Sequence, residues 1–238
     1  MAKLTFKFSR LQIFTHVAAW VPMLILAWDA YRGNLSVNPY QAATQRTGDT
    51  AILLLILSLA CTPVNTLFKV PEVLKLRRPL GLYAFLYVCT HLFIFTGLDY
   101  GFNWNLLVND LSDKRYILVG LAAFLCLLPL AATSWRWWMV RLGKNWKRLH
   151  RLVYLAAVLV VLHFAWVVKG DVSRLQGDIL RPLLAGLAVT LLLVARIRPV
   201  RKRLSGVAQN LIPGRSRPRK PLHTPAPAAV KREELSGD

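Results

Sequence analysis

Three histidines lie within or at the edge of long apolar stretches of the chain, namely His91, His150 and His163. Placing a histidine in the hydrocarbon core of a membrane costs free energy, so such a residue indicates a functional site. The imidazole nitrogen is a common protein ligand of haem iron. These residue types and positions therefore predict axial ligation of haem iron between membrane helices.

The elements that must position these histidines are six apolar stretches, each close to the roughly 20 residues that a helix needs to cross a bilayer core of about 30 Å. They cover residues 11–28, 50–68, 79–97, 116–134, 149–168 and 179–196. Because 55% of the 238 residues are hydrophobic, neither a soluble domain nor a disordered chain is expected. We predict an all-α integral membrane protein, a bundle of six transmembrane helices over residues 11–196.

Positive charge is distributed unevenly between alternate connections of these helices. Of the 31 Lys and Arg residues, 24 lie in the N-terminal segment, in 69–78, in 136–151 and after residue 195, and 7 lie in the other connections. Lys and Arg accumulate on the cytoplasmic side, so both termini are expected there. Residues 1–10 form the predicted cytoplasmic N-terminus, and the basic, proline-rich residues 197–238 are expected to be a disordered cytoplasmic tail. With the charge explained by topology, nucleic-acid binding is not expected.

Prolines mark two of the predicted helices. Thr62-Pro63 predicts a kink in the second helix, with a freed backbone carbonyl that needs a local partner. Pro79 falls in the first turn of the third helix, where a missing N–H does no harm.

His91 and His163 are expected at similar depth in the membrane. His91 lies twelve residues after Pro79, about 18 Å from the inner end of its helix at 1.5 Å per residue. The thirteen residues from His150 to His163 cover about 20 Å. Because the third and fifth helices run in the same direction, His91 and His163 could bind opposite faces of one haem.

His150 lies at the inner boundary, where its nearest counterpart on the third helix is Arg77, fourteen residues before His91. For a second haem there, Arg77, a neighbouring side chain, water and an exogenous molecule remain open as the other axial ligand. At about 100° per residue, Arg77 and His91 are about 40° apart around their helix, but His150 and His163 are about 140° apart. Either the fifth helix is distorted or its two histidines face different neighbours.

Three arginines at the same inner boundary are candidates to pair with haem propionates, because the guanidinium group matches the geometry of a carboxylate. They are Arg77, Arg78 and Arg151.

Each histidine also has a simpler interpretation. His91 and His163 could form structural hydrogen bonds between helices, and His150 could be a basic residue at the membrane interface. His16, early in the first helix, could be structural or could belong to a quinone site.

At these residues the chain resembles a known family. The matching stretches are residues 77–85 through His91, 130–134, 142–154 and 163–169, together with Thr47-Gly48 and Thr62-Pro63. They are similar to the MsrQ (formerly YedZ) family, haem-binding membrane subunits of the bacterial periplasmic protein-methionine-sulfoxide reductase system. That family is related to the transmembrane domain of ferric reductases and NADPH oxidases. The resemblance covers roughly residues 5–200 and excludes the tail.

The resemblance implies a multi-pass protein of the bacterial inner membrane that carries haem b and transfers electrons without being catalytic itself. The implied acceptor is a periplasmic molybdopterin reductase, MsrP, which repairs methionine sulfoxide in oxidised proteins. The implied donor is the quinone pool or a cytosolic flavin reductase, and the family is also described as binding FMN. In the wider oxidase family a histidine occupies the place of Arg77. Of the haems in the wider family, the resemblance therefore implies only the one between His91 and His163 with two histidine ligands in this chain.

Three other functions remain open at this stage. A self-contained transmembrane reductase of metal ions or quinone would keep the haem but need no protein acceptor. A small-solute transporter would use the histidines to relay protons, although no inverted repeat of the transporter kind is evident in the sequence. A scaffold is the third, because a helix bundle does not by itself determine function.

Overall fold

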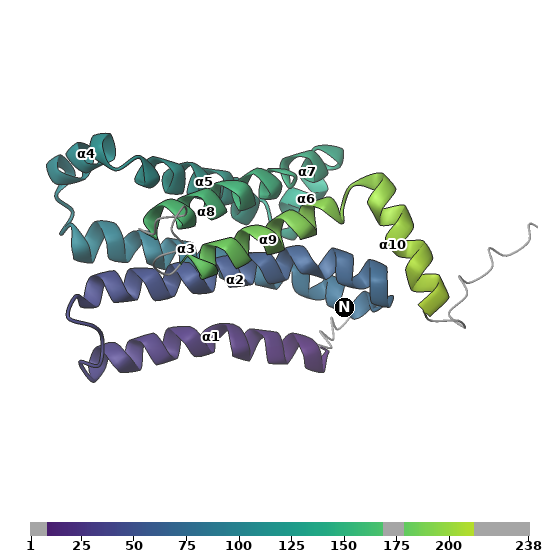
Figure 1. The fold of residues 1–238 in the computed structure, drawn as a ribbon, viewed down its shortest axis with the longest axis horizontal. Coiled ribbons are helices and arrows are strands. Elements are labelled where there is room, and N and C mark those ends of the chain that lie inside the picture. Colours follow the sequence, from purple (N-terminus) through teal and green to yellow (C-terminus); the bar gives the residue numbers. More distant parts are fainter. Residues whose placement is uncertain (1–8, 169–178, 212–238) are drawn as a thin grey trace, which may run out of the picture.

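The computed structural model describes residues 9–168 and 179–211, and every regular element in these two ranges is a helix. The predicted all-α fold is confirmed. The long helices lie side by side along one axis of the molecule (Figure 1). They are α1 (Arg10–Tyr31), α2 (Pro39–Phe68), α3 (Arg77–Phe93), α5 (Arg115–Ala132), α8 (Leu152–Val167) and α9 (Leu180–Val194).

Shorter elements lie at the two ends of this bundle. They are the 3₁₀-helix η1 (Pro71–Leu76), the π-helix η2 (Ile94–Asp99), α4 (Trp104–Asp113), α6 (Arg136–Leu142), α7 (Lys144–Leu149) and α10 (Arg198–Leu211). In Figure 1, α4 lies at one end, and α6, α7 and α10 lie at the other.

Several runs of helix are long and apolar enough to cross a membrane. Within the described ranges there are five, and up to six if α9 and the first part of α10, which are bent by 88° relative to each other, count as one span. The five are Arg10–Tyr31, Pro39–Phe68, Pro71–Asp99, Arg115–Ala132 and Lys144–Val167. The structure therefore supports a membrane-spanning bundle, with the sixth predicted span resting on the bent pair.

The second helix begins well before its predicted start at residue 50. The Asn38 side chain accepts a hydrogen bond from the backbone N–H of Gln41 (3.2 Å), and Pro39 occupies the first helical position. Both features favour the start of a helix. Hydropathy marks the residues that lie in hydrocarbon, whereas the cap determines where the helix begins, so α2 extends beyond its apolar stretch.

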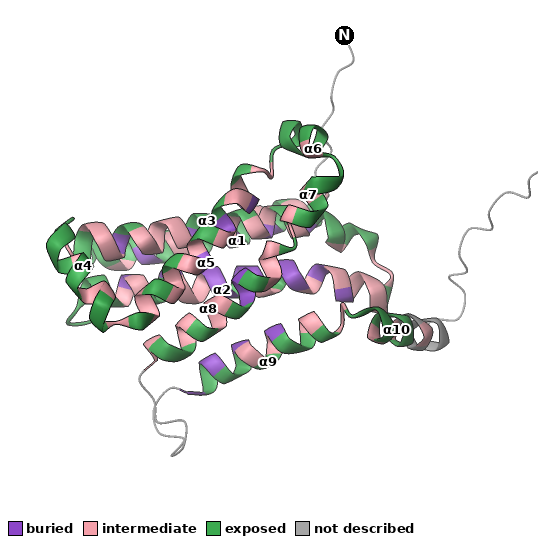
Figure 2. Ribbon diagram, turned by 90° about the horizontal axis from the view of Figure 1, so that it is seen from above, coloured by how far each residue is buried: buried purple, intermediate pink, exposed green. Residues whose placement is uncertain are grey.

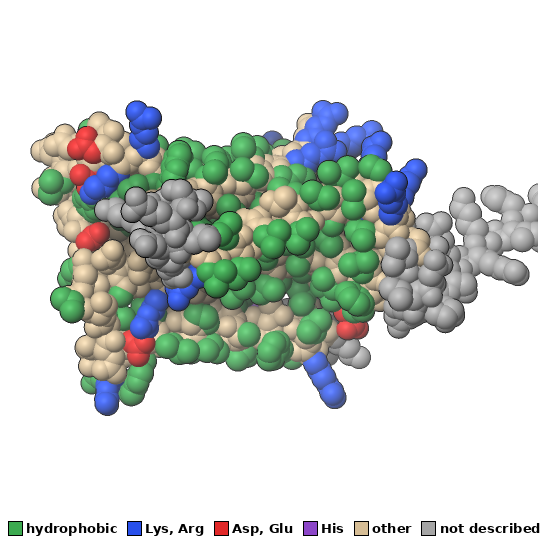
Figure 3. Space-filling model, viewed as in Figure 1, with side chains coloured by type: hydrophobic (Ala, Val, Ile, Leu, Met, Phe, Trp, Pro, Cys, Tyr) green, Lys and Arg blue, Asp and Glu red, His purple; other side chains and the backbone are tan. Residues whose placement is uncertain are grey.

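The outer faces of the helices are apolar and exposed. Figure 2 shows buried residues along the inward faces of the long helices and exposed residues on their outer sides. In Figure 3, hydrophobic side chains cover the middle of the visible face and Lys and Arg lie towards its ends. An exposed apolar middle between charged ends is the surface expected of a bundle in lipid.

Two antiparallel helix pairs form the centre of the bundle, because α2 packs against α3 and α5 packs against α8. Three of the most deeply buried residues are alanines: Ala156 and Ala157 are 0% exposed and Ala84 is 1% exposed, beside Leu59 (1%) and Tyr87 (2%). Small side chains at these positions allow close approach of the helix backbones.

The partner of the carbonyl freed by Pro63 comes from a distant part of the chain. Pro63 has no N–H to donate to Leu59, four residues earlier. One guanidinium nitrogen of Arg196 donates instead to the Leu59 carbonyl (2.6 Å), and the other terminal nitrogen donates to the Tyr154 hydroxyl (2.9 Å). Arg196 therefore ties the end of α9 to the proline-containing turn of α2 and to α8.

A helix is present where a tail without regular structure was expected. In residues 198–211 of α10, the apolar residues Val200, Leu204, Val207 and Leu211 recur at helical spacing among basic residues. The overall polarity of the segment hid this pattern. The expectations for residues 1–8 and for the tail after Leu211 lie outside the described residues.

Candidate functional site

The structure brings two of the three predicted histidines together. His91 lies near the C-terminal end of α3 and His163 lies near that of α8. Their ring centroids are 6.3 Å apart, and their planes cross at 84°. The predicted match in depth between these two residues agrees with this arrangement.

Each of these imidazoles is oriented by a backbone carbonyl of the neighbouring helix. Nδ1 of His91 lies 2.9 Å from the Thr44 carbonyl on α2, and Nδ1 of His163 lies 2.8 Å from the Tyr116 carbonyl on α5. Because a carbonyl can only accept, Nδ1 carries the proton and donates it in both rings. The lone pair of each Nε2 is therefore available to a metal ion.

The two halves of the site repeat each other in sequence as well as in space. Each histidine lies 47 residues after the residue whose carbonyl it contacts. In both halves a glycine, Gly48 or Gly120, follows that carbonyl by four residues. The buried residues of the same helix faces also correspond, each separated from its counterpart by 72 positions: Ala51 and Ala123, Leu55 and Leu127, and Ala84 and Ala156.

The distance between the rings fits haem with two axial histidines. A bond from imidazole nitrogen to a transition metal is about 2.0–2.1 Å long. With ring bonds of about 1.33 Å, the ring centroid lies about 1.1 Å behind the nitrogen. Two imidazoles on opposite sides of one iron therefore have centroids about 6.4 Å apart, close to the 6.3 Å of His91 and His163.

The donor set also suits an iron whose other ligands come from a macrocycle. Over residues 9–168 and 179–211 there is no group of three or more His, Cys, Asp or Glu side chains that could hold a bare metal ion. A structural or catalytic zinc site normally takes three or four protein ligands, whereas haem needs only one or two.

His150 lies elsewhere, in the turn between α7 and α8. Its Nδ1 donates to the Trp146 carbonyl (3.1 Å), and its ring stacks on the Trp146 indole at a centroid distance of 3.9 Å. The helix break after Leu149 explains the sequence geometry, since His150 and His163 do not belong to one regular helix. His150 is close enough to Arg77 and Arg78 to interact with their charges.

The predicted propionate partners are spread over the end of the bundle that carries α6, α7 and α10. Arg78 donates to the backbone carbonyl of Ser134, and Arg151 is exposed. Arg77 is partly buried and is repelled by the charge of Arg196. Sequence reasoning missed Arg196, although its position at the end of the last apolar stretch was the available signal.

His16 pairs with an aromatic residue of α3. Its Nδ1 lies 2.9 Å from the Tyr83 hydroxyl, and the two rings meet edge to face with centroids 5.6 Å apart. Tyr83 also contacts Trp20 edge to face. This contact between α1 and α3 agrees with the structural interpretation of His16.

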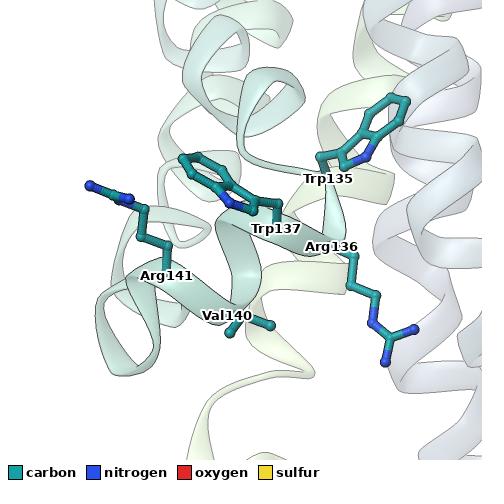
Figure 4. Close-up of a pocket in the computed structure, with 5 residues that line it drawn as sticks. All are labelled: Trp135, Arg136, Trp137, Val140 and Arg141. Atoms are coloured by element: carbon teal, nitrogen blue, oxygen red, sulfur yellow. The ribbon is translucent and has the colours of Figure 1, made fainter.

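A shallow hollow of about 420 Å³ lies on α6, among tryptophan and arginine side chains (Figure 4). The Trp135 side chain is 75% exposed and the Trp137 side chain 56%. The Arg141 guanidinium lies over the Trp137 ring, 5.0 Å from its centroid. Exposed indoles beside arginines are typical of residues at a membrane interface.

At the opposite end, α4 is attached to the end of η2 by a polar cluster. Asp110 accepts hydrogen bonds from the Lys114 ammonium group (2.5 Å) and from the Tyr100 hydroxyl. These two hydrogen bonds hold the pKa of the Asp110 carboxyl below its usual range. The carboxylate is therefore charged at neutral pH and anchors α4 at this end of the bundle.

The chain is similar to several proteins named "Protein-methionine-sulfoxide reductase heme-binding subunit MsrQ". The protein of Rhodospirillum rubrum is 42% identical over 204 residues, which cover 85% of this chain and 94% of that protein. The protein of Caulobacter vibrioides is 40% identical over 156 residues, covering 65% and 74% respectively. That of Xanthomonas axonopodis pv. citri is 39% identical over 180 residues, covering 73% and 83%. Residues 47–161 match the family described as "Ferric reductase like transmembrane component".

Proposed function

Because the chain belongs to the MsrQ family, we propose that it binds haem b between His91 and His163 and transfers electrons across the bacterial inner membrane. The acceptor in this proposal is a periplasmic molybdopterin methionine-sulfoxide reductase, MsrP. The observation that carries the proposal is the separation of 6.3 Å between the two imidazole centroids, which suits two axial ligands of one iron.

In this function the chain binds and orients the cofactor. When bound, haem supplies one-electron redox chemistry. The Thr44 and Tyr116 carbonyls hold the two imidazoles in the tautomer that presents Nε2 to a metal. A hydrogen bond from Nδ1 also makes the ligand more basic, which favours ferric iron. The apolar side chains of the bundle keep water from this region.

The direction of transfer follows from the proposed topology. With both termini in the cytoplasm, the histidine pair lies in the outer half of the bundle, on the same side as α4. An acceptor in the periplasm would then meet the end from which electrons leave. The donor, the quinone pool or a cytosolic flavin reductase, would deliver electrons towards the inner end, where His150 and Arg77 lie.

Replacement of the axial ligands tests haem binding directly. His91→Ala and His163→Ala are each expected to remove most of the bound bis-histidine haem, because one imidazole alone leaves the iron without its second protein ligand. The measurement is the absorption spectrum and the haem content per chain of the purified full-length protein. His16→Ala is the matched control, since it removes another histidine with a hydrogen-bonded Nδ1 from an apolar helix.

Full haem content in both ligand variants would contradict the site, and loss of haem from His16→Ala alone would place it elsewhere.

Flavin measured in the same preparations tests the FMN that the resemblance implies. Reoxidation of the reduced protein by the purified molybdopterin reductase tests the proposed acceptor. Reoxidation by ferric chelates or quinone, with none by that reductase, would favour the self-contained reductase instead.

A further inference from the structure

Two glycines lie directly against the two imidazoles. A Cβ atom added at Gly120 would lie 2.8 Å from both Nδ1 and Cε1 of His163. A Cβ atom added at Gly48 would lie 3.2 Å from Nδ1 and 3.3 Å from Cε1 of His91. Carbon atoms in favourable contact are about 3.5–4.0 Å apart. Each ring therefore occupies space that any residue other than glycine would fill.

The glycine and the carbonyl act on the same edge of each ring. The carbonyl of Thr44 or Tyr116 lies four residues before the glycine on the same helix, so the two are one turn apart on one face. The Nδ1–Cε1 edge of the histidine lies over the bare backbone of that turn. The hydrogen bond determines where the edge lies, and the glycine determines how closely the ring approaches the helix.

The arrangement occurs twice and gives imidazole planes that cross at 84°. The largest possible angle between two planes is a right angle. A sizeable rotation of either ring about its bond to a metal would therefore make the angle between the imidazole planes smaller than 84°. The two helices that carry the glycines therefore set a defined angle between the ligand planes.

We propose that Gly48 and Gly120 are positioning residues that hold the two axial imidazoles nearly perpendicular to each other on the haem iron. This proposal rests on the proposed function, because it requires haem between His91 and His163. The glycines act through the histidines and do not bind the iron themselves.

Perpendicular ligand planes have a spectroscopic consequence. Each imidazole donates π-electron density into the iron d orbital that its plane selects. With perpendicular planes the two d orbitals receive equal donation and remain close in energy, so the low-spin ferric iron shows one very large g value. With parallel planes the orbitals separate, and three well-resolved g values appear in the electron paramagnetic resonance (EPR) spectrum.

The test compares EPR spectra of the oxidised, haem-loaded full-length protein and four alanine variants. In Gly120→Ala the new methyl group must displace the His163 ring, so the largest g value is expected to fall. In Gly48→Ala the contact is less severe, and a smaller shift in the same direction is expected. The matched controls are Gly186→Ala and Gly81→Ala, whose Cβ atoms would meet Val161 at 3.4 Å and Ser58 at 3.5 Å. Both controls are expected to keep the wild-type spectrum.

The outcomes separate this inference from the proposed function. Loss of haem from Gly120→Ala, with helix content and the controls unchanged, also supports the inference, because the ring has then lost its binding position. A wild-type spectrum with three well-resolved g values overturns the inference but leaves the haem site intact. Wild-type spectra and full haem in both Gly48→Ala and Gly120→Ala overturn it as well. A wild-type protein without haem overturns the inference together with the proposed function.

Discussion

The histidines of this bundle share a hydrogen bond at Nδ1 but differ in what lies around their rings. Nδ1 is hydrogen-bonded in His16, His91, His150 and His163 alike, so this bond alone does not identify a ligand. In His91 and His163 the carbonyl that accepts this hydrogen bond belongs to a neighbouring helix, and the two rings lie at the separation of two axial ligands. In His150 the accepting carbonyl is that of Trp146, one turn earlier in the same segment, and the nearby charged groups are arginines. His16 also has its partner on a neighbouring helix, Tyr83 on α3. The separation between the two rings therefore distinguishes His91 and His163 from the other histidines.

His150→Ala is expected to leave the haem between His91 and His163 in place. His150 stacks on Trp146 and belongs to a different segment from the paired imidazoles, so its removal does not alter their contacts. The check is the EPR signal of the bis-histidine haem in the variant, together with the haem content per chain. A fall in haem content with that signal intact would identify an inner haem ligated by His150. Loss of the signal itself would contradict the independence of the two positions.

At the scale of the elements, one arginine compensates for a proline in another helix. Arg196 lies where α9 gives way to α10, and it supplies the Leu59 carbonyl with a donor that Pro63 cannot provide. A buried carbonyl without a donor is costly where water is excluded. The bend between α9 and α10 is therefore joined by Arg196 to the turn of α2 that precedes Pro63.

A double-mutant cycle measures this coupling. Arg196→Ala is expected to lower the free energy of unfolding by about 1.5–3 kcal/mol, the range for a hydrogen bond from a charged group. In a Pro63→Ala background residue 63 regains its N–H, and the loss on Arg196→Ala is expected to be smaller by about 1 kcal/mol. Unfolding of the protein in detergent micelles provides the measurement, with the exposed Arg198→Ala as control. Equal losses in both backgrounds would show that Arg196 does not act through the Leu59 carbonyl.

At the scale of the whole molecule, the ends of the bundle differ in both structure and charge. The α4 end carries the cluster of Asp110, Lys114 and Tyr100, whereas the other end carries α6, α7 and α10 with their arginines, lysines and exposed tryptophans. The second composition is typical of a cytoplasmic face. The structure places the histidine pair nearer to the end that carries α4, because His91 lies in the last turn of α3, which is followed by η2.

Two exposed asparagines at opposite ends provide a matched test of topology. In a background with the three native cysteines replaced by alanine, Asn109→Cys on α4 and Asn145→Cys on α7 are both exposed positions. Asn109→Cys is expected to react with a membrane-impermeant maleimide in intact spheroplasts, and Asn145→Cys only after permeabilisation. The opposite pattern of labelling would invert the proposed orientation and with it the direction of electron transfer.

The sequence by itself determined the class of the molecule and the identity of the paired histidines. Apolar length and the distribution of Lys and Arg depend on composition along the chain, so they were readable without coordinates. The depth of His91 and His163 followed from helix rise alone, since both count from the same side of the membrane.

Only the tertiary structure determined what surrounds these residues. The 84° between the ring planes, the clearance provided by Gly48 and Gly120, and the donor that Arg196 brings to the Leu59 carbonyl all join positions on different helices. Periodicity predicts which face of a helix is apolar, but it does not predict which other helix lies against that face. The repetition of the carbonyl, glycine and histidine at a spacing of 72 residues was present in the sequence. It became visible only when the two histidines were found facing each other, because the contacts that give it meaning are made between helices.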